Sequence, residues 1–386
     1  MNFIKSYKIH FLFAIASIVF YFNFAYNLER SDFTKLISLY AALFFIAYLF
    51  IEKLKLNFWL LAGFGIVFRL IFIPAIPNLS QDFYRFLWDG RLLAQGVSPY
   101  LLTPSLSNAL EVTVLQNNQL IEGMGALNAS HFSNYPPINQ LFFAIAAVFA
   151  GKSILGSVMV LRALIILADI GILYFGKNIL EKLNLPIKNI FWYFLNPFII
   201  IELTGNLHFE GVMLFFFVWA LYLLFKGKWA WAATLIGISI SVKLLPLLFL
   251  PFFLKYFPIK NKSPKVLKTL GVSVKTLIGF YLIIGITVLL TFLPFLSSEF
   301  IQNFASTISL WFQNFEFNAS VYYIIRWMGF QVVGWNIIGT VGKILPVLVL
   351  LFILGIAFFR NNKTPQQLLT AMLFAVSFYF LLSTTI

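Results

Sequence analysis

Long apolar runs separated by short polar connectors fill most of this sequence. Most runs approach the roughly 20 residues that a helix needs to cross the ~30 Å hydrocarbon core of a bilayer. A membrane β-barrel would instead show ~10-residue segments of alternating polarity. The pattern predicts an all-α, polytopic bundle of about eleven transmembrane helices, near residues 9–26, 34–51, 57–76, 138–151, 155–176, 190–205, 211–226, 229–254, 271–295, 336–359 and 365–384.

The composition supports the same class. Of the 386 residues, 61% are hydrophobic and only 10% are charged, whereas water-soluble domains carry about a quarter charged residues. No long segment has a soluble composition, so we expect one integral membrane domain over 1–386. The first run follows Lys5 and Lys8 and lacks a small-residue cleavage site, which favours a retained span over a signal peptide. Because cysteine is absent, disulfides and thiolate metal sites are excluded.

The net charge of +14 comes largely from lysines in short connectors. Cytoplasmic loops that face anionic lipid have this pattern. It predicts membrane lipids, and no nucleic acid, as partners of the basic groups. The predicted cytoplasmic loop at 255–270 and the residues after it are the most basic stretch, with Lys255, Lys260, Lys262, Lys265, Lys268 and Lys275.

The positive-inside rule also predicts the orientation of the chain. Basic pairs mark three inner segments: Lys5 and Lys8, Lys53 and Lys55, and Arg360 and Lys363. The N-terminus is then cytoplasmic, and the polar segments 78–137 and 296–335 are extracytoplasmic.

One connector disagrees with this count, because Lys177, Lys182 and Lys188 fall on the outer side. Either one of the short runs near 138–151 or 190–226 does not cross the membrane, or the rule is broken locally.

The loop 78–137 is the longest polar interruption, and it holds four of the thirteen acidic residues: Asp82, Asp89, Glu111 and Glu122. Ser80 is a plausible N-cap for a helix over 82–95, which Gly96 ends. Asp82, Arg85 and Asp89 share one face of that helix. We expect the helix to lie on the membrane surface, with its apolar side down and its charged stripe facing a cavity or water.

Several motifs resemble one family. The string DFYRFLWDGR at 82–91, followed by SPY at 98–100, resembles the first-loop signature of polytopic glycosyltransferases of the GT-C class. It looks closest to bacterial mannosyltransferase-like members that use a polyprenyl-phosphate sugar. Further elements in the same order resemble that family: NYPPINQ at 134–140, NP at 196–197 with Glu202, GNLHFEG at 205–211, KLLP at 243–246, and FNASVYY at 317–323 with Arg326. Many relatives carry paired acids in the loop, whereas Gln81 precedes Asp82 here.

The resemblance implies transfer of a hexose, most often mannose, from a polyprenyl-phosphate carrier to a hydroxyl of a lipid or glycan acceptor. The transfer would take place with inversion, on the outer face of a bacterial inner (plasma) membrane. Such chemistry needs a base for the hydroxyl proton and donors that stabilise the departing phosphate. We assign Asp82 as the base; the alternative is that it only favours the helix N-terminus electrostatically.

Other charged residues of the loop have two interpretations each. Arg85 and Arg91 could bind phosphate through the guanidinium fork, or they could contact lipid headgroups. Asp89 is a substrate-binding candidate, although a structural partnership with Arg85 or Arg91 is the simpler interpretation.

Three candidates lie near or within apolar runs, where an ionisable residue is a functional candidate. His208 could donate to phosphate or position the sugar, with Glu210 beside it, or the two could form a capped turn. Our span count places that turn on the inner side, in conflict with a role at an outer-face site. Lys243, which the pattern places inside an apolar helix, could hold the carrier phosphate or snorkel to the interface.

Aromatic residues and Arg326 complete the candidate set. Tyr135, Tyr322 and Tyr323 could stack on sugar, although membrane-interface belts are the simpler explanation. Arg326 could bind phosphate or an anionic acceptor. Arg162 and Asp169 share a helix face and favour a structural interhelical role.

The sequence requires no metal or other cofactor. Asp82 and Asp89 lie two helical turns apart, about 10 Å along the axis, so they cannot chelate one ion directly unless the helix is broken. A divalent cation is compatible with the pattern but is not required by it.

Two other functions remain open. A transporter or flippase of lipid-linked sugars would keep charges and broken helices near the bilayer midplane, often with inverted repeats. A non-catalytic assembly partner in envelope polysaccharide synthesis would be expected to lose Asp82. The acids clustered in an extramembrane loop favour the enzyme.

Overall fold

A computed structural model describes residues 8–54, 56–107, 113–257, 266–318 and 320–384. Within these ranges all regular structure is helical, which confirms the all-α, polytopic membrane class. Some predictions fall on residues outside the described ranges, namely Lys5, Lys55, Glu111, Lys260, Lys262 and Lys265.

Within the described ranges, six helices are long and apolar enough to cross a membrane. They are α2 (Lys8–Tyr26), α3 (Phe33–Tyr48) with η1 (Leu49–Lys53), α8 (Ile154–Lys182), the apolar part of α13 (Val266–Phe292) with η6 (Leu293–Phe295), α16 (Ile338–Phe359) and α17 (Pro365–Leu382). Four shorter apolar helices accompany them: α4 (Phe58–Leu70), α7 (Pro137–Ala150), α12 (Trp229–Val242) and η5 (Leu245–Lys255).

Two of the predicted spans are not continuous helices. The run 190–205 is divided among η3 (Ile187–Ile190), α9 (Phe191–Phe194), α10 (Pro197–Ile199) and η4 (Ile200–Gly205). The α10–η4 unit meets α11 (Glu210–Phe225) at an angle of 113°. The run 229–254 breaks between α12 and η5, just before Pro246. Proline lacks the N–H of a helical hydrogen bond, so it stands at helix starts.

Local side-chain caps explain where several helices begin. Asp32 accepts from the Lys35 N–H at 3.0 Å at the start of α3. Asn57 accepts from the Leu60 N–H at 2.8 Å at the start of α4. Ser153 accepts from the Gly156 N–H at 2.9 Å at the start of α8. Each cap satisfies a backbone donor that has no partner within its helix.

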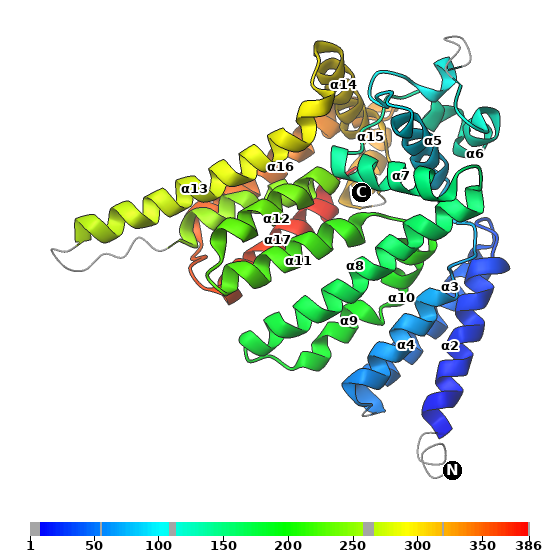
Figure 1. Cartoon of the computed structure of the whole chain (residues 1–386), viewed down its shortest axis with the longest axis horizontal. Coiled ribbons are helices and arrows are strands. Elements are labelled where there is room, and N and C mark those ends of the chain that lie inside the picture. Colours follow the sequence, from blue (N-terminus) through cyan, green and yellow to red (C-terminus); the bar gives the residue numbers. More distant parts are fainter. Residues whose placement is uncertain (1–7, 55, 108–112, 258–265, 319, 385–386) are drawn as a thin grey trace.

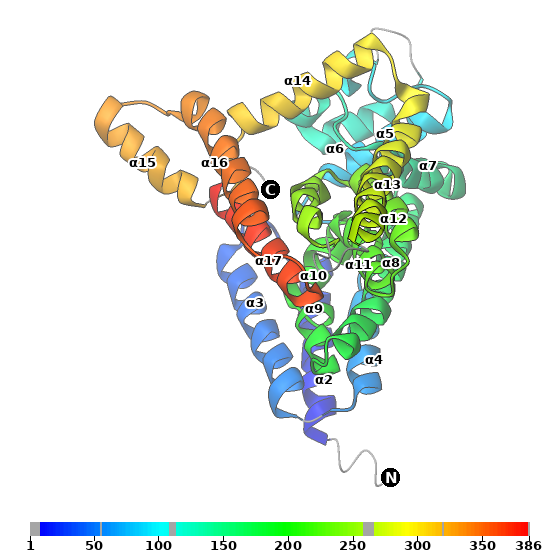
Figure 2. The same cartoon turned by 90° about the vertical axis from the view of Figure 1, so that its left-hand side faces the viewer.

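The polar segments gather at one end of the molecule, which we call the loop end (Figures 1 and 2). It carries α5 (Asp82–Ala94), α6 (Asn117–Ala129) and α14 (Ser298–Asn314). The start of α2 lies at the opposite end, near the turn between α3 and α4.

The long helix α8 runs between the two ends. Near its start, Arg162 donates to the carbonyl oxygens of Ile73 and Ala75 at 2.8 and 2.7 Å, next to the loop. Near its finish, the Lys177 ammonium lies 5.2 Å from the ring centre of Phe58, the first residue of α4. The connector with Lys177, Lys182 and Lys188 therefore shares the opposite end with Lys53.

This placement accounts for the disagreement among the lysines. Because α7 joins the loop to the start of α8, it begins and ends on the loop side. It packs against α5 and α8. The run 138–151 is therefore the short run that does not connect the two ends.

A buried polar network joins the N-terminal helices to the rest. The Arg69 Nε of α4 pairs with Asp169 Oδ2 of α8 at 2.7 Å, and both side chains are fully buried. The Tyr193 hydroxyl donates to the other Asp169 oxygen at 2.7 Å. Arg162 also donates to the Thr204 and Gly205 carbonyl oxygens. Arg162 and Asp169 thus have the structural, interhelical role that their spacing predicted.

Candidate active site

Helix α5 is enclosed rather than lying on a surface. It begins at Asp82 and ends at Ala94, close to the predicted bounds. The Asp82 N–H donates to Ser80 Oγ at 3.3 Å, but the N-cap position belongs to Gln81, whose side chain makes no capping bond. Most of the helix, charged residues included, is buried. The prediction that the charged stripe faces a cavity or water is wrong for Arg85 and Asp89, because α6 and α7 pack against α5.

Gly90 explains how the helices come so close. A Cβ on Gly90 would overlap the carbonyl group of Phe143 in α7. Glycine is therefore required at this position because only a residue without a side chain leaves room for the backbone of α7.

Arg85 and Asp89 form the centre of a buried cluster. Arg85 Nε pairs with Asp89 Oδ1 at 2.6 Å. Arg85 Nη1 also donates to the carbonyl oxygens of Asn128 and His131, at 3.0 and 2.8 Å. Ser133 and Gln140 donate to Asp89 Oδ2 at 2.6 and 2.9 Å. The cluster holds α5 against the end of the loop and against α7. Asp89 therefore has a structural partnership with Arg85, which was the alternative to substrate binding.

Arg91 is also occupied within the loop. Its Nη1 donates to the Leu115 carbonyl oxygen at 2.5 Å. Burial lowers the pKa of the Arg91 guanidinium from its ordinary value. Arg85 and Arg91 are thus placed to hold the loop together, and neither is exposed to lipid headgroups.

Asp82 differs from the other charged residues of α5 because it is only half-buried. Asn128 Nδ2 donates to Asp82 Oδ1 at 3.4 Å. The negative charge of Asp82 also acts on Tyr135. Burial is the main cause, and the Asp82 charge the second, of a Tyr135 pKa well above its usual value. The carboxylates of Asp89 and Glu210 act in the same direction and Arg85 opposes them.

A polar pocket of about 240 Å³ opens beside Tyr135. Its charged centre is an ion pair between Lys243 Nζ and Glu210 Oε1, whose side chains are 30% and 36% exposed. The pocket is lined by Asn134, Tyr135, Pro136, Glu210, Lys243, Leu244, Leu245, Ile308, Trp311, Tyr379 and Phe380.

Two expectations about these residues are corrected. Lys243 does not lie inside an apolar helix: it follows the last residue of α12, in an extended conformation with φ −147° and ψ 145°. Glu210 and the turn before it do not lie at the inner end, because Glu210 shares the pocket with Asn134 and Tyr135 of the first loop. Our span count failed here because it treated the run 138–151 as a full crossing, which moved every later segment to the wrong side.

His208 lies in the turn at the 113° bend, after Leu207 with a left-handed φ of 62°. Its Nδ1 is 3.8 Å from Glu202 Oε2. Asn206 Nδ2 donates to the same Glu202 oxygen at 3.0 Å, and Tyr40 donates to the other at 3.0 Å. The turn is thus held by polar contacts that reach as far as α3.

A larger cavity of about 790 Å³ adjoins this turn. Glu202, His208 and Glu210 stand among its lining residues, and the others are almost all apolar side chains of α9, α10, η4, α11, η5 and α17. We call it the apolar cavity. It shares Glu210, Leu245 and Phe380 with the polar pocket. A charged pocket and a large apolar space therefore meet at a common wall.

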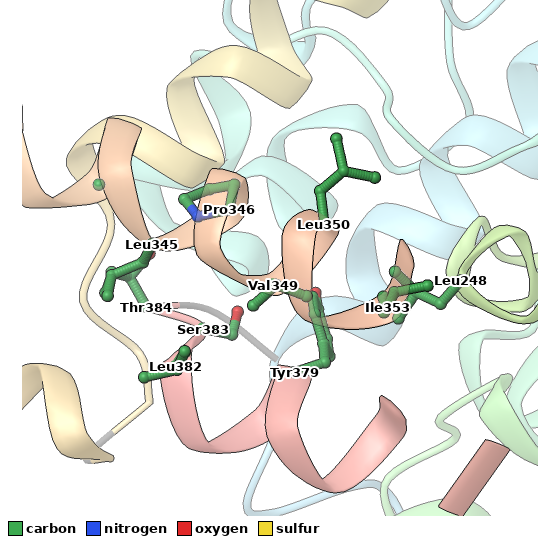
Figure 3. Close-up of a pocket in the computed structure, with 11 residues that line it drawn as sticks. Leu248, Leu345, Pro346, Val349, Leu350, Ile353, Tyr379, Leu382, Ser383 and Thr384 are labelled. Carbon is green, nitrogen blue, oxygen red and sulfur yellow. The ribbon is translucent and has the colours of Figure 1, made fainter. Parts of the chain in front are cut away.

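A third, smaller cavity of about 150 Å³ lies between α16 and α17 (Figure 3). Leu345, Pro346, Val349 and Ile353 of α16 line it from one side, and Tyr379, Leu382 and Ser383 from the other, with Val349 next to Tyr379. Tyr379 also lines the polar pocket, so the last helix separates the two spaces.

The late aromatic and basic candidates lie elsewhere. Arg326, in α15 (Val321–Val333), pairs with Glu316 at 3.2 Å and packs over the Tyr323 ring. The Tyr322 hydroxyl donates to Glu316 at 2.6 Å. None of these residues lines the polar pocket or the apolar cavity, and α15 lies well apart from α5 and α6 (Figure 2). The structure does not bring Tyr322, Tyr323 or Arg326 to the other candidates.

Within the described part of the chain, no three His, Asp or Glu side chains gather where they could hold one metal ion. The pocket does contain residues that motif spacing did not single out. Ile308 and Trp311 come from α14, and Tyr379 and Phe380 come from α17. No local signal could have found Trp311 or Tyr379, because the chain holds 9 Trp and 16 Tyr, most of them expected in apolar packing.

The fold and the site together define a polytopic helical membrane protein with a charged pocket beside an apolar cavity. Residues 36–257, more than half of the chain, match the family model described as alpha-(1->6)-mannopyranosyltransferase, N-terminal domain. The chain belongs to this family.

Two relatives place this match in context. Alpha-(1->6)-mannopyranosyltransferase A of Mycobacterium tuberculosis is 26% identical over 180 residues, which are 46% of this chain and 33% of that protein. Alpha-(1->6)-mannopyranosyltransferase B of Corynebacterium glutamicum is 27% identical over 171 residues, 42% of this chain and 27% of that protein. The chain thus aligns with 27–33% of the length of these curated relatives.

Proposed function

We propose that this protein is a GT-C-type membrane glycosyltransferase that moves a mannosyl residue from a polyprenyl-phosphate carrier to a hydroxyl of a lipid or glycan acceptor. The observation that carries the proposal is the shared wall between the polar pocket and the 790 Å³ apolar cavity. A lipid-phosphate sugar has the same division between a charged head and an apolar tail. Family membership and the names of the relatives support the choice of mannose.

The donor phosphate would bind beside Lys243 and His208, with the polyprenyl chain in the apolar cavity. Negative charge grows on the phosphate as the sugar departs, and an ammonium held in place stabilises that charge without reorganisation. Glu210 holds Lys243 at the wall that the two spaces share. His208 lines the apolar cavity only, so it would meet the phosphate from the side of the tail.

Asp82 would serve as the base. The acceptor oxygen attacks the anomeric carbon from the face opposite the phosphate, and its proton passes to the Asp82 carboxylate. The bond between the anomeric carbon and the phosphate oxygen breaks, its electron pair leaves with the phosphate, and the configuration inverts. The partial exposure of Asp82, whose side chain is held only by Asn128 at 3.4 Å among the described residues, supports this role.

The arrangement of basic residues supports an orientation for this chemistry. Lys177 lies with Phe58 at the end opposite the loop, and Lys255 donates to carbonyl oxygens of Phe358 and Arg360. With these lysines in the cytoplasm, the N-terminus is cytoplasmic and the loop end faces outward from a bacterial plasma membrane.

The test uses purified full-length protein, a labelled polyprenyl-phosphate hexose and a membrane extract that supplies acceptors. Asp82→Asn should lower transfer by ~10²–10⁴-fold, the usual contribution of a positioned base. Glu122→Gln is the matched control, because Glu122 is an exposed acid of the same loop and should leave transfer unchanged. Near-normal transfer by folded Asp82→Asn removes Asp82 as the base, and a chelator added to the wild type should leave transfer intact.

One observation favours a second candidate, a flippase of lipid-linked sugars. The helix pair bent by 113° between Gly205 and Glu210 resembles the discontinuous helices of transporters. In sealed proteoliposomes, movement of the labelled donor across the membrane with no transfer to any acceptor would favour this alternative over the enzyme.

A further inference from the structure

We propose that Trp311 and Asn134 form the binding subsite for the acceptor, and that the acceptor presents a hexopyranose ring there. The inference rests on the proposed transferase function. It adds the two residues that recognise the sugar end of the acceptor.

The lining of the polar pocket divides into two parts. Glu210, Leu245 and Phe380 also line the apolar cavity and therefore belong to the side on which the donor phosphate and tail would bind. Asn134 and Trp311 do not line that cavity. They come from the two polar segments at the loop end, 78–137 and 296–335, so an acceptor arriving from the aqueous side meets them first.

Trp311 is held as a fixed aromatic surface. Phe315 stacks on its ring with 4.7 Å between ring centres, and Phe317 packs at 5.6 Å. The helix α14 that carries Trp311 is anchored to the first loop, where Asn303 Nδ2 donates to the Tyr100 carbonyl oxygen at 3.0 Å. A ring fixed in this way loses little freedom when a flat apolar ligand face packs on it.

Asn134 supplies the polar half of the subsite. Among the described residues its side-chain amide makes no hydrogen bond within the protein, although the residue is half-buried and lines the pocket. An amide offers both a donor and an acceptor, which suits the vicinal hydroxyls of a sugar. An aromatic face beside an uncommitted amide matches a pyranose, which has an apolar C–H face and a polar edge.

The proposal is tested by separating acceptor binding from donor binding. Initial rates are measured with an alkyl hexoside acceptor and with a labelled polyprenyl-phosphate hexose, each varied in turn. Trp311→Ala should raise the KM for the alkyl hexoside at least ~10-fold, and Asn134→Ala should raise it ~3–10-fold, as expected for one lost hydrogen bond. The donor KM and the slow hydrolysis of the donor by water should stay within ~2-fold of the wild type.

Two further variants keep the test sharp. Trp311→Phe retains an aromatic face and should restore most of the acceptor affinity, whereas a residue needed only for folding would show no such recovery in KM. Trp327→Ala is the matched control, because Trp327 lies in the same outer segment with 63% of its surface exposed, and it should behave as the wild type.

The outcomes separate this inference from the proposed function. Unchanged acceptor KM in both Trp311→Ala and Asn134→Ala overturns the subsite, as does an equal rise in donor and acceptor KM. If the wild type transfers no sugar at all, the proposed function fails instead. In that case quenching of tryptophan fluorescence by the alkyl hexoside, present in the wild type and lost in Trp311→Phe, still supports the subsite, and its absence overturns it.

Discussion

Two ion pairs near the loop end show opposite environments. The Arg85–Asp89 pair has side chains that are 2% and 0% exposed. The Lys243–Glu210 pair has side chains that are 30% and 36% exposed, and both residues line the polar pocket. The first pair is surrounded by further partners, namely the carbonyl oxygens of Asn128 and His131 and the side chains of Ser133 and Gln140.

This difference distinguishes charged residues that stabilise the fold from charged residues that are free to bind a ligand. A buried pair whose members have several further partners cannot exchange one of them for a ligand without leaving a charge unpaired. A pair that opens on a cavity can exchange its partner, because solvent or a ligand replaces the contact. Arg85 and Asp89 therefore belong to the structure of the loop, whereas Lys243 remains open to a ligand, as our proposal of phosphate binding requires.

The largest expected effect is on stability and comes from the closed pair. Asp89→Ala should lower the free energy of unfolding by ~3–5 kcal/mol, because it leaves the Arg85 guanidinium buried without its counter-charge. Thermal unfolding in detergent micelles measures the shift.

The double variant Arg85→Met with Asp89→Leu is the control for that prediction. Replacing both charges by apolar groups removes the unpaired charge, so the double variant should be more stable than Asp89→Ala. If Asp89→Ala unfolds like the wild type, the cluster does not hold the loop.

The next effect is on activity and comes from the open pair. Lys243→Ala should lower transfer ~10²–10³-fold, the usual loss when one donor to a developing negative charge is removed, and it should leave thermal unfolding nearly unchanged. The radiolabel transfer assay with the polyprenyl-phosphate hexose measures the rate.

Lys177→Ala is the matched control. Lys177 is also partly exposed and pairs with Glu181 at 3.6 Å, but it lies at the opposite end. Its loss should change neither transfer nor stability by a measurable amount. Equal rates for Lys243→Ala and Lys177→Ala would contradict the role of the polar pocket.

The smallest expected effect is on the packing of α5 against α7, which encloses the Arg85–Asp89 pair. Gly90→Ala should lower the free energy of unfolding by ~1–3 kcal/mol, because the new Cβ would push α5 away from the Phe143 carbonyl. Gly63→Ala, at a helical glycine with open space around it, should be neutral or slightly stabilising. If both variants have the same unfolding temperature, the close approach of α5 and α7 is not needed for stability.

Sequence reasoning brought only part of the candidate set together, since Asp82 lines neither the polar pocket nor the apolar cavity. Tyr135, Glu210 and Lys243 do share one pocket, although the count of spans had put Glu210 at the wrong end. Arg326 is paired with Glu316 away from that pocket, because its place depends on how α15 packs and not on its own short motif. Trp311 could not be chosen among nine tryptophans before the fold brought α14 over the first loop.

The sequence by itself determined the membrane class, the helical content and the start of α5, because the length of an apolar run and the chemistry of a helix start are local properties. Only the tertiary structure decided which charges are enclosed and which are open. Burial depends on segments far apart in the chain: Arg85 is closed in by residues 43 and 46 positions away, and Lys243 meets Glu210 across 33 positions. No spacing within one motif carries that information, since the dielectric environment of a charge is set by whatever packs against it.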